Sequence, residues 1–384
     1  MATRVGVDCR ALGNINRNRG IGRYTANVVE GLAAHVDGLE LVLFGYGDSP
    51  APGLLDSEVL DKFEWRRLRG ADDGSIYGSP RGHLDFARAV NTSGVALFHG
   101  IDHNMTPLLK CPSIVTVHDL IPLVLRGPYL GPKSWLWMQA HRAACRRANL
   151  VVAVSESTRD DVARIWKISR ERIEAVPEGV SPRYRPVEGS PLEKILELYG
   201  IRRPYLLYLG GFDPRKNIGN MLLGFKRFKR SGGEGTMVLC GDTGGFEDYL
   251  ADEIEELGLN GSVLLPGFVA DEDLPALYSG ALALVFVSVY EGFGLPLLEA
   301  MACGTPVLAS DVSSIPGVVG EAALLVDPLD PTAIAGGLTL LAEDPGTRAR
   351  LVEKGLTRSS GFTWEKTVAR IRELYEEVLG GAVT

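Results

Sequence analysis

The feature that most constrains the fold is an alternation of strand and helix patterns that occurs twice along the 384 residues. Short apolar runs, the length of buried strands, alternate with longer segments of helical periodicity. In the first half, strands are expected at residues 4–9, 39–45, 95–99, 113–117, 150–154 and 173–176, and helices at 22–35, 82–92, 133–148 and 156–167. Such alternation predicts a parallel sheet covered by helices on both faces.

The second half repeats this pattern. Strands are expected at residues 205–209, 236–240, 262–265, 281–287, 307–309 and 323–326, and helices at 217–229, within 244–257, and at 273–280, 296–302, 331–342, 347–355 and 364–379. The proline-containing segment 181–191 between the halves is expected to be a linker. We therefore expect an α/β protein with two doubly wound, Rossmann-like domains, residues 1–190 and 191–363. In such domains ligands bind at the carboxyl ends of the strands.

Charge and cysteine content exclude several classes of function. The net charge is −8, divided as +3 over the first 190 residues and −11 over the rest. A nucleic-acid partner is not expected, because neither half has the basic, aromatic-rich surface that such proteins use. The chain has no long apolar segment and no signal peptide, and its five scattered cysteines suit reduced thiols, so a cytoplasmic location is expected.

Two carboxylates, Glu291 and Glu299, flank a glycine-rich turn between an apolar strand and a helix that Pro296 begins. Turns of this kind direct backbone N–H groups outward at the positive end of a helix, which suits a phosphate. Carboxylates at such a place would repel a phosphate but would accept hydrogen bonds from sugar hydroxyls. This segment therefore predicts a nucleotide-sugar site.

A second motif, Gly210-Gly211-Phe212-Asp213-Pro214-Arg215-Lys216-Asn217, follows the first strand of the second half. Arg215 and Lys216 stand at the start of a helix, where cations oppose the macrodipole. A bound diphosphate would explain them, and stabilising a leaving diphosphate is a catalytic task. Two solvated basic residues are the alternative interpretation.

These motifs occur together with Gly20-Ile21-Gly22-Arg23-Tyr24, Val117-His118-Asp119-Leu120, Leu274-Pro275-Ala276-Leu277-Tyr278 and Phe362-Thr363-Trp364-Glu365. The ordered set resembles a retaining glycosyltransferase of the GT-B fold, from glycosyltransferase family four, and is most similar to its mannosyltransferase-B-like branch. The resemblance covers nearly the whole chain. It implies two Rossmann-like domains that face a central cleft, a C-terminal helix at about residues 364–384 that packs back on the first domain, and no catalytic metal or other cofactor.

The resemblance also implies roles for individual residues. Glu291, His118, Lys216 and Arg215 would be catalytic: Glu291 at the donor sugar, His118 near sugar and acceptor, and the two cations on the diphosphate. Glu299 would bind the ribose. The remaining donor-binding positions would be the backbone of Gly292, Phe293, Gly294 and Leu295, the loop glycines Gly211, Gly20 and Gly22, and Phe268 and Val269 beside the base.

Three positions depart from the pattern of the resembled branch. Many relatives have a basic residue where Gly211 stands, so the diphosphate would depend more heavily on Arg215 and Lys216. The branch usually has Asn in place of Glu178 and Glu in place of Gly317. The roles of Glu178 and Gly317 stay open at this point.

The expected reaction is hexose transfer from a nucleotide sugar to an acceptor hydroxyl, with GDP-mannose as the first choice of donor. A UDP- or ADP-sugar-dependent glucosyl- or N-acetylhexosaminyltransferase is the alternative, and a sugar-nucleotide-binding protein without turnover is an alternative of another class. The acceptor could be a saccharide, a lipid-linked sugar or a small molecule, and neither its identity nor the oligomeric state follows from the sequence.

Several other side chains have simpler explanations. His99 and His103 follow a strand and could line an acceptor site, although loop histidines are the simpler interpretation. Asp271-Glu272-Asp273 looks like a metal-binding triplet but precedes a helix, so capping explains it better. The helix at 133–148 is basic and aromatic, and it suits peripheral contact with the inner membrane face, an acceptor-flanking position or partial burial.

Overall fold

The computed structural model describes residues 2–13, 17, 20–34, 38–47, 55, 63–68, 80–125, 131–241 and 245–381. The chain divides into two compact units, one formed by residues 1–179 with 364–384 and the other by residues 180–363. His35 and Gly244, the outer ends of two expected helices, lie outside the described residues. Each unit is an α/β domain with its own sheet, as the sequence predicted.

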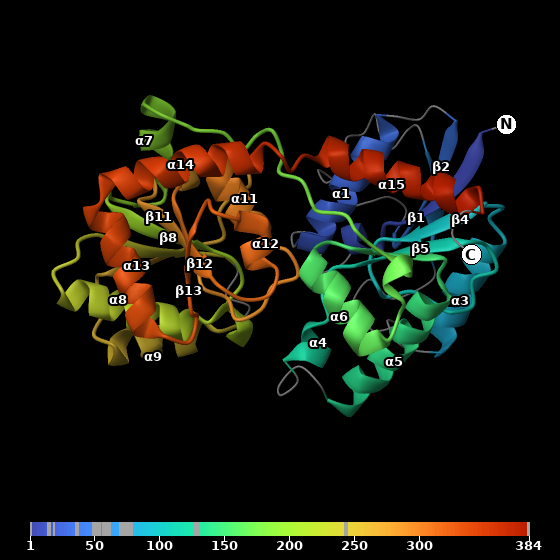
Figure 1. Cartoon of the computed structure of the whole chain (residues 1–384), viewed down its shortest axis with the longest axis horizontal. Helices are drawn as coiled ribbons and strands as arrows, with labels where there is room; N and C mark the ends of the chain where they lie inside the picture. Colours follow the sequence, from blue (N-terminus) through green and yellow to red (C-terminus); the bar gives the residue numbers. More distant parts are fainter. Residues whose placement is uncertain are drawn as a thin grey trace. The chain divides into compact units, whose positions relative to one another are not determined.

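The first unit contains a seven-stranded parallel sheet in the order β3-β2-β1-β4-β5-β6-β7. Its strands are β1 (Thr3–Asp8), β2 (Leu39–Gly45), β3 (Glu64–Arg67), β4 (Leu97–Gly100), β5 (Ser113–Val117), β6 (Leu150–Ala153) and β7 (Ile173–Ala175). Its helices are α1 (Gly20–Ala33), α3 (Pro80–Asn91), α4 (Ile121–Val124), α5 (Pro132–Arg147), α6 (Glu156–Trp166) and α15 (Trp364–Leu379). Strands β4, β5 and β6 are entirely buried because helices cover both faces of the sheet (Figure 1).

The second unit contains a six-stranded parallel sheet in the order β10-β9-β8-β11-β12-β13. Its strands are β8 (Tyr205–Leu209), β9 (Thr236–Cys240), β10 (Val263–Gly267), β11 (Ala283–Phe286), β12 (Val307–Ser310) and β13 (Leu324–Val326). Its helices are α7 (Ser190–Leu198), α8 (Ile218–Arg230), α9 (Glu247–Glu256), α10 (Leu274–Gly280), α11 (Leu295–Ala302), α12 (Ile315–Val319), α13 (Pro331–Glu343) and α14 (Pro345–Ser359). Helix α8 packs against α13, and α11 packs against α10 and α14.

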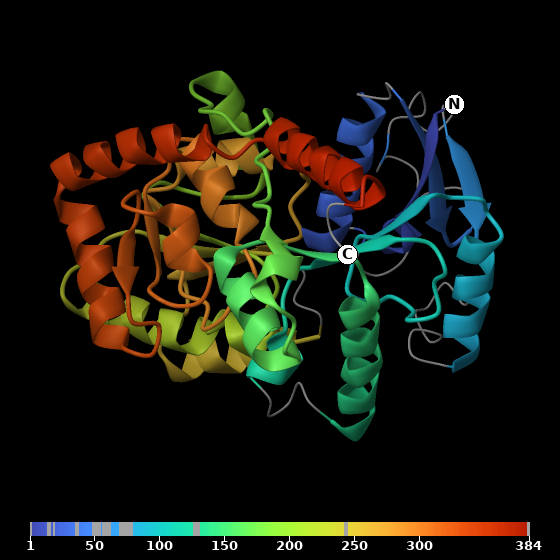
Figure 2. The ribbon, with the colours of Figure 1, turned by 45° about the vertical axis from the view of Figure 1, so that its right-hand side comes forward.

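The last helix, α15, belongs to the first unit although it follows the second unit in the sequence. It packs beside α1, as both views of the ribbon show (Figures 1 and 2). Val368 of α15 fills the space above Gly31 of α1, where a Cβ atom would lie only 2.5 Å from the valine. The hydroxyl of Tyr375 contacts His99 Nδ1 at 2.7 Å in the sheet below. The apolar stripe seen in the sequence is therefore the docking face of this helix.

The segment after Gly179 belongs to the second unit rather than to a free linker. Tyr184 packs edge-on against Tyr278, with ring centroids 6.0 Å apart, and the Val187 N–H donates to Ser279 Oγ at 3.0 Å. Helix α7 starts at Ser190, inside the expected linker, because the apolar residues Leu192 and Leu196 share one buried face. The prolines concealed this helix from the sequence, as they stand at its first turn and before it.

Helix α5 is partly buried, in agreement with the simplest of its three interpretations. Met138 and Cys145 are buried, whereas Trp135 and Leu136 are 51% and 67% exposed. None of the helices that the structure describes is long and apolar enough to cross a membrane.

Candidate active site

The expected diphosphate and sugar residues of the second unit meet at the point where its strand order reverses. Strand β8 has β9 on one side and β11 on the other, so the connections after β8 and β11 leave the sheet in opposite directions. Such a switch point opens a crevice at the carboxyl ends of two neighbouring strands, where doubly wound proteins bind their ligands. Arg215 and Lys216 follow β8, and Glu291 follows β11.

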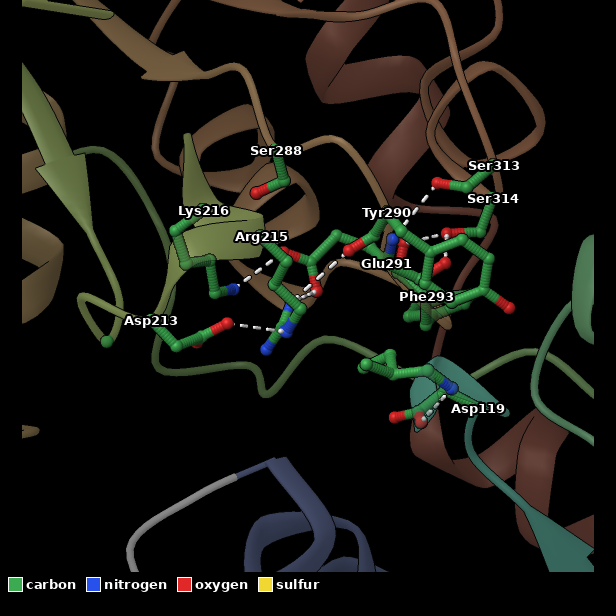
Figure 3. A network of polar contacts seen from close by, with 12 residues as sticks. Asp119, Asp213, Arg215, Lys216, Ser288, Tyr290, Glu291, Phe293, Ser313 and Ser314 are labelled. Carbon is green, nitrogen blue, oxygen red and sulfur yellow. Dashed lines mark hydrogen bonds and ion pairs between the residues drawn. The ribbon is translucent and has the colours of Figure 1, made fainter. Parts of the chain in front are cut away.

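Arg215 and Lys216 both bind Glu291 (Figure 3). Lys216 Nζ lies 2.6 Å from Glu291 Oε1, and Arg215 Nη1 lies 2.6 Å from Oε2. Arg215 Nε also lies 3.2 Å from Asp213 Oδ1. Lys216 and Glu291 are buried. The two cations and Glu291, for which the sequence predicted separate roles, therefore form one largely buried ionic network.

The backbone on both sides of this network is held by further hydrogen bonds. Asn217 adopts the left-handed conformation, with φ of 61°, and its Nδ2 donates to the carbonyls of Val287 and Pro328 at 2.9 and 2.7 Å. The Val289 N–H donates to the Arg215 carbonyl at 2.8 Å. These bonds tie the segment after β8 to the segment after β11, so the network does not depend on flexible loops.

Two serines support the chain around Glu291. Ser313 Oγ accepts from the Glu291 N–H at 3.0 Å. Ser314 Oγ lies 2.9 Å from the carbonyl oxygens of both Glu291 and Phe293, to which it is placed to donate. Figure 3 shows both hydroxyls directed at this turn. No sequence pattern singles out these serines, because they lie more than twenty residues after Glu291 and carry no motif.

The charges of the network are set by burial and by mutual attraction. Burial raises the pKa of Glu291, but Lys216 and Arg215 oppose it more strongly, so this pKa lies below its ordinary value. Glu291 is therefore ionised at neutral pH. Burial lowers the pKa of Lys216, with Glu291 acting in the opposite direction.

The glycine turn after Glu291 has the shape that the sequence predicted. Gly294 has φ of +111°, and a Cβ atom there would lie 2.8 Å from Leu297, so only glycine suits this position. Helix α11 begins at the next residue, Leu295, and Pro296 stands in its first turn. The N-terminal end of this helix is therefore presented beside the ionic network.

Glu299 lies on the same helix and is buried. Its Oε2 accepts a hydrogen bond of 2.7 Å from the hydroxyl of Tyr278, which lies on α10. This pairing was not predicted from the sequence, although Tyr278 ends one of the motifs that carry the family resemblance. The tyrosine therefore helps to fix the position of this buried carboxylate.

The other site residues predicted for the second unit are Phe268, Val269 and Gly211. Phe268 and Val269 follow β10, and the first is 64% exposed whereas the second is buried. The Gly211 carbonyl accepts a hydrogen bond from the hydroxyl of Tyr208.

Gly317 departs from the family pattern and lies in α12. The Arg358 guanidinium donates to the carbonyls of Gly317 and Val318 at 2.6 and 2.9 Å and so caps the end of α12. Gly317 thus has a structural environment that needs no acidic side chain.

In the first unit, Gly20 and Gly22 do not form the expected loop. Both lie in the first turn of α1, which starts two residues earlier than the sequence predicted. The Thr25 hydroxyl bonds the Ile21 carbonyl at 2.7 Å, as is usual inside a helix. The loop was expected from the family resemblance, and that expectation was wrong because the helix expected from Gly22 onward also includes Gly20.

His118 follows β5 and is buried with a partner at each ring nitrogen. Its Nε2 lies 3.0 Å from the Ile101 carbonyl, and its Nδ1 lies 3.4 Å from Glu178 Oε1. The ring of Tyr24 packs edge-on against it, with centroids 4.8 Å apart. The departure from the family pattern at Glu178 is therefore a direct contact with His118.

The remaining candidates have structural partners. His99 is bound by Tyr375 and by Thr116, at 2.7 and 2.9 Å, which accounts for its burial. Asp273 stands at the N-cap position of α10 but does not cap it, because its carboxylate accepts from the Tyr199 hydroxyl at 2.8 Å. Across the described residues, no group of three or more His, Cys, Asp or Glu side chains could hold a metal ion.

Comparison with known proteins identifies the family. Residues 18–184 match the family described as Glycosyltransferase Family 4, and residues 198–358 match Glycosyl transferases group 1. O-antigen chain mannosyltransferase B of Escherichia coli is 31% identical over 285 residues, which are 73% of this chain and 74% of that protein.

Solved structures share the fold. Sucrose-phosphate synthase from Thermosynechococcus elongatus has a TM-score of 0.80 and 22% identity, over 99% of this chain and 100% of that one. The Anabaena protein HepE in complex with UDP-glucose has a TM-score of 0.76 and 17% identity, over 97% of this chain and 99% of that one. With the two parallel sheets described above, these matches establish that the chain belongs to glycosyltransferase family four and is a glycosyltransferase of the GT-B fold.

Proposed function

We propose that this glycosyltransferase transfers mannose from GDP-mannose to an acceptor hydroxyl with retention of the anomeric configuration. The single observation that carries the donor site is the buried network of Lys216, Arg215 and Glu291 at the strand switch point. The 31% identity with an O-antigen mannosyltransferase supports mannose as the sugar. The second unit would bind the donor and the first unit the acceptor.

Lys216 has the donors that a diphosphate needs. An ammonium carries three N–H groups, and Glu291 uses one of them. Among the described residues the other close feature is the ring of Phe286, whose centroid lies 5.1 Å from Nζ and which attracts the cation without accepting a conventional hydrogen bond. Phosphate oxygens would satisfy the remaining donors, and the charge that develops on the leaving diphosphate would be stabilised by the same ammonium.

The other residues follow from this placement. Glu291 would accept hydrogen bonds from the hydroxyls of the donor sugar, and Glu299, held by Tyr278, would accept from the ribose. The remaining proposed contacts to the diphosphate are Arg215 and the backbone of Gly292, Phe293, Gly294 and Leu295, with Gly211 near it. Phe268 and Val269 would lie beside the base. His118 would contact the sugar and the acceptor.

The proposed step forms one bond and breaks one bond on the same face of the sugar. The acceptor oxygen attacks the anomeric carbon while the bond from that carbon to the diphosphate oxygen breaks. The proton of the acceptor hydroxyl passes to the departing diphosphate, so GDP leaves with the electron pair of the broken bond. No protein nucleophile and no metal ion takes part in this scheme.

Three variants test the assignment: Glu291→Gln, Lys216→Ala and His118→Ala. Each is expected to lower kcat by roughly 100-fold or more, the typical effect of removing a group that stabilises transition-state charge. Lys354→Ala is the matched control, because Lys354 forms an exposed ion pair with Glu321 in the second unit. Unchanged kinetics in all three purified variants would overturn the assignment.

A thermal-shift panel of GDP, UDP, ADP and dTDP tests the choice of base. The cognate nucleotide stabilises the folded protein by mass action, by about 2.7 kcal/mol at 100 times its Kd. A larger shift with UDP or ADP would favour the glucosyl- or N-acetylhexosaminyltransferase alternative. Binding without hydrolysis or transfer across a panel of sugar donors and acceptors would favour a sugar-nucleotide-binding protein.

We also propose peripheral contact with the inner membrane face through α5, where Trp135 and Leu136 are exposed and Arg146 and Arg147 lie in the last turn. Aromatic and apolar side chains beside basic ones are typical of helices that lie on anionic membranes. Co-sedimentation with anionic vesicles should fall in a Trp135→Ala/Leu136→Ala variant. Absence of binding by the unchanged protein would contradict this proposal.

A further inference from the structure

The environment of His118 in the first unit determines which protons its ring carries. Both ring nitrogens face oxygen atoms: Nε2 lies 3.0 Å from the Ile101 carbonyl, and Nδ1 lies 3.4 Å from Glu178 Oε1. A carbonyl oxygen can only accept, so Nε2 must carry a proton. A bare lone pair on Nδ1 would then face a carboxylate oxygen, and the two would repel each other.

A proton on Nδ1 turns this repulsion into an ion pair. His118 and Glu178 are each less than one-tenth exposed, so their attraction is screened by water much less than that of a surface pair. Burial lowers the pKa of His118, but the hydrogen bond and charge of Glu178 oppose it, and the resulting pKa lies above the ordinary value. The geometry and the electrostatics thus favour the same protonation state.

The charged and titratable groups around this pair come from several elements. Asp102 and His103 follow β4, with His103 Nδ1 2.9 Å from Asp102 Oδ1, and the Asp102 charge also favours a protonated His118. His99 lies in β4, and burial lowers its pKa to about 3, so it stays neutral beside His118. Tyr24 of α1 is buried, which raises its pKa, and it contributes a neutral ring.

The positions of the two residues are determined by the sheet. His118 leaves the carboxyl end of β5, and Glu178 follows β7, with β6 between these strands. The Thr158 hydroxyl donates to the His118 carbonyl at 3.2 Å, and Thr367 of α15 donates to the carbonyl of Pro177, next to Glu178, at 2.8 Å. Both side chains are therefore attached to backbone that is itself anchored, which is what a preorganised pair requires.

We propose that Glu178 is a positioning residue that holds His118 as an imidazolium, with Nε2–H on the Ile101 carbonyl and Nδ1–H on the carboxylate. His118 then serves as a fixed cation whose two N–H groups are both occupied, and it cannot take a proton from the acceptor. This assignment deepens the proposed function, because the kinetic importance of the pair rests on a role for His118 in transfer. The protonation state itself does not depend on that role.

The direct test is a nitrogen-15 NMR titration of the histidine rings in the full-length protein. In the unmodified protein, His118 should be doubly protonated at pH 7. In Glu178→Gln, its titration midpoint should fall by about 1–3 pH units, the usual effect of removing an opposite charge at this distance. A neutral His118 ring at pH 7 in the unmodified protein, or an unchanged midpoint in E178Q, would overturn the proposal.

Two further variants make the result specific. Glu174→Gln is the matched control, because Glu174 lies on β7 near Glu178 but pairs with Arg370 at 3.0 Å, so the His118 midpoint should not move. Glu178→Asp keeps the charge and should retain a raised midpoint, which preserves the test if E178Q folds poorly.

Kinetics then separate this proposal from the proposed function. If His118 acts in transfer, the alkaline limb of the kcat profile should shift to lower pH in E178Q by the same amount as the NMR midpoint and should return toward its original position in E178D. If the NMR midpoint shifts but the kcat profile does not change, the ion pair is supported and the catalytic role of His118 is contradicted. A shifted kcat profile without an NMR shift would contradict the role of Glu178.

Discussion

The hydroxyl of Tyr278 donates to Glu299 Oε2 over 2.7 Å, and both side chains are buried inside the second unit. Tyr278 lies on α10 and Glu299 on α11, two helices that pack against each other. The bond therefore fixes the carboxylate proposed for the ribose to a neighbouring helix. If Glu299 binds the ribose as proposed, the position of the nucleotide depends on how these two helices pack.

Tyr278→Phe should weaken nucleotide binding without large loss of stability. A buried hydrogen bond contributes about 1 kcal/mol, so the Kd for GDP should rise by about fivefold. Isothermal titration calorimetry measures this change. Tyr205→Phe is the control, because it removes a similar bond, of 2.6 Å, from the Leu277 carbonyl on the same helix. Equal weakening in both variants would mean that Tyr278 acts through packing and not through Glu299.

His141 should make the first unit sensitive to acid. It is fully buried on α5, and burial lowers its pKa to about 2, against about 6.5 in an unfolded chain. Between these values the unfolded state binds a proton that the folded state does not, so the free energy of unfolding falls as the pH falls below about 6.5. The slope for one histidine is about 1.4 kcal/mol per pH unit.

The variant His141→Phe removes this contribution while keeping an aromatic ring beside Trp137, whose ring centroid lies 4.0 Å from that of His141. Between pH 7 and pH 5, the free energy of unfolding should fall by about 2 kcal/mol less in the variant than in the unmodified protein. Urea unfolding at the two pH values measures the difference. The same loss in both proteins would show that His141 can be protonated in the folded state.

Tyr375→Phe should loosen α15 from the first unit. The change leaves His99 Nδ1 without its partner at 2.7 Å inside the core, and an unsatisfied buried group costs about 1–3 kcal/mol. Hydrogen exchange of the α15 amides should therefore become faster. Tyr249→Phe, at an exposed position in the second unit, should leave this exchange unchanged. Protection of α15 equal to that of the unmodified protein would contradict the proposed anchoring by His99.

Gly241→Ala should destabilise the second unit strongly. Gly241 has φ of +145°, and a Cβ atom there would lie 1.9 Å from the Gly210 carbonyl oxygen, at the start of the loop that leads to Arg215. Neither backbone segment can move away without a large energetic cost, so the free energy of unfolding is expected to fall by about 3 kcal/mol or more. Thermal unfolding measures it, and activity should fall together with stability.

Gly336→Ala is the matched control for that prediction. Gly336 lies in α13 with no atom within 4 Å of an added Cβ. Alanine favours a helix interior by about 0.5–1 kcal/mol over glycine, so the melting temperature should rise slightly. A similar decrease in both variants would point to a general effect of glycine replacement and not to the contact at Gly210.

The sequence predicted nearly every strand and helix of both units, because buried parallel strands are continuous apolar runs that flank amphipathic helices. It missed α7, the short helices α4 and α12, and the short strand β3. The Ser190–Leu198 helix follows prolines, which obscure its helical pattern, and Glu64–Arg67 lacks the apolar run of a buried strand. The helical state of Gly20 was also missed, since glycine is a weak guide to helix boundaries.

The sequence by itself determined the two-domain α/β architecture, the glycine turn at Gly294 and the identity of the charged residues at the strand ends. These properties depend on local periodicity and on short motifs. The tertiary structure alone decided which polar side chains pair: Lys216 and Arg215 with Glu291, Tyr278 with Glu299, and His118 with Glu178. Such pairs join residues far apart in the chain, and their partners are selected by strand order and burial, which no local pattern records.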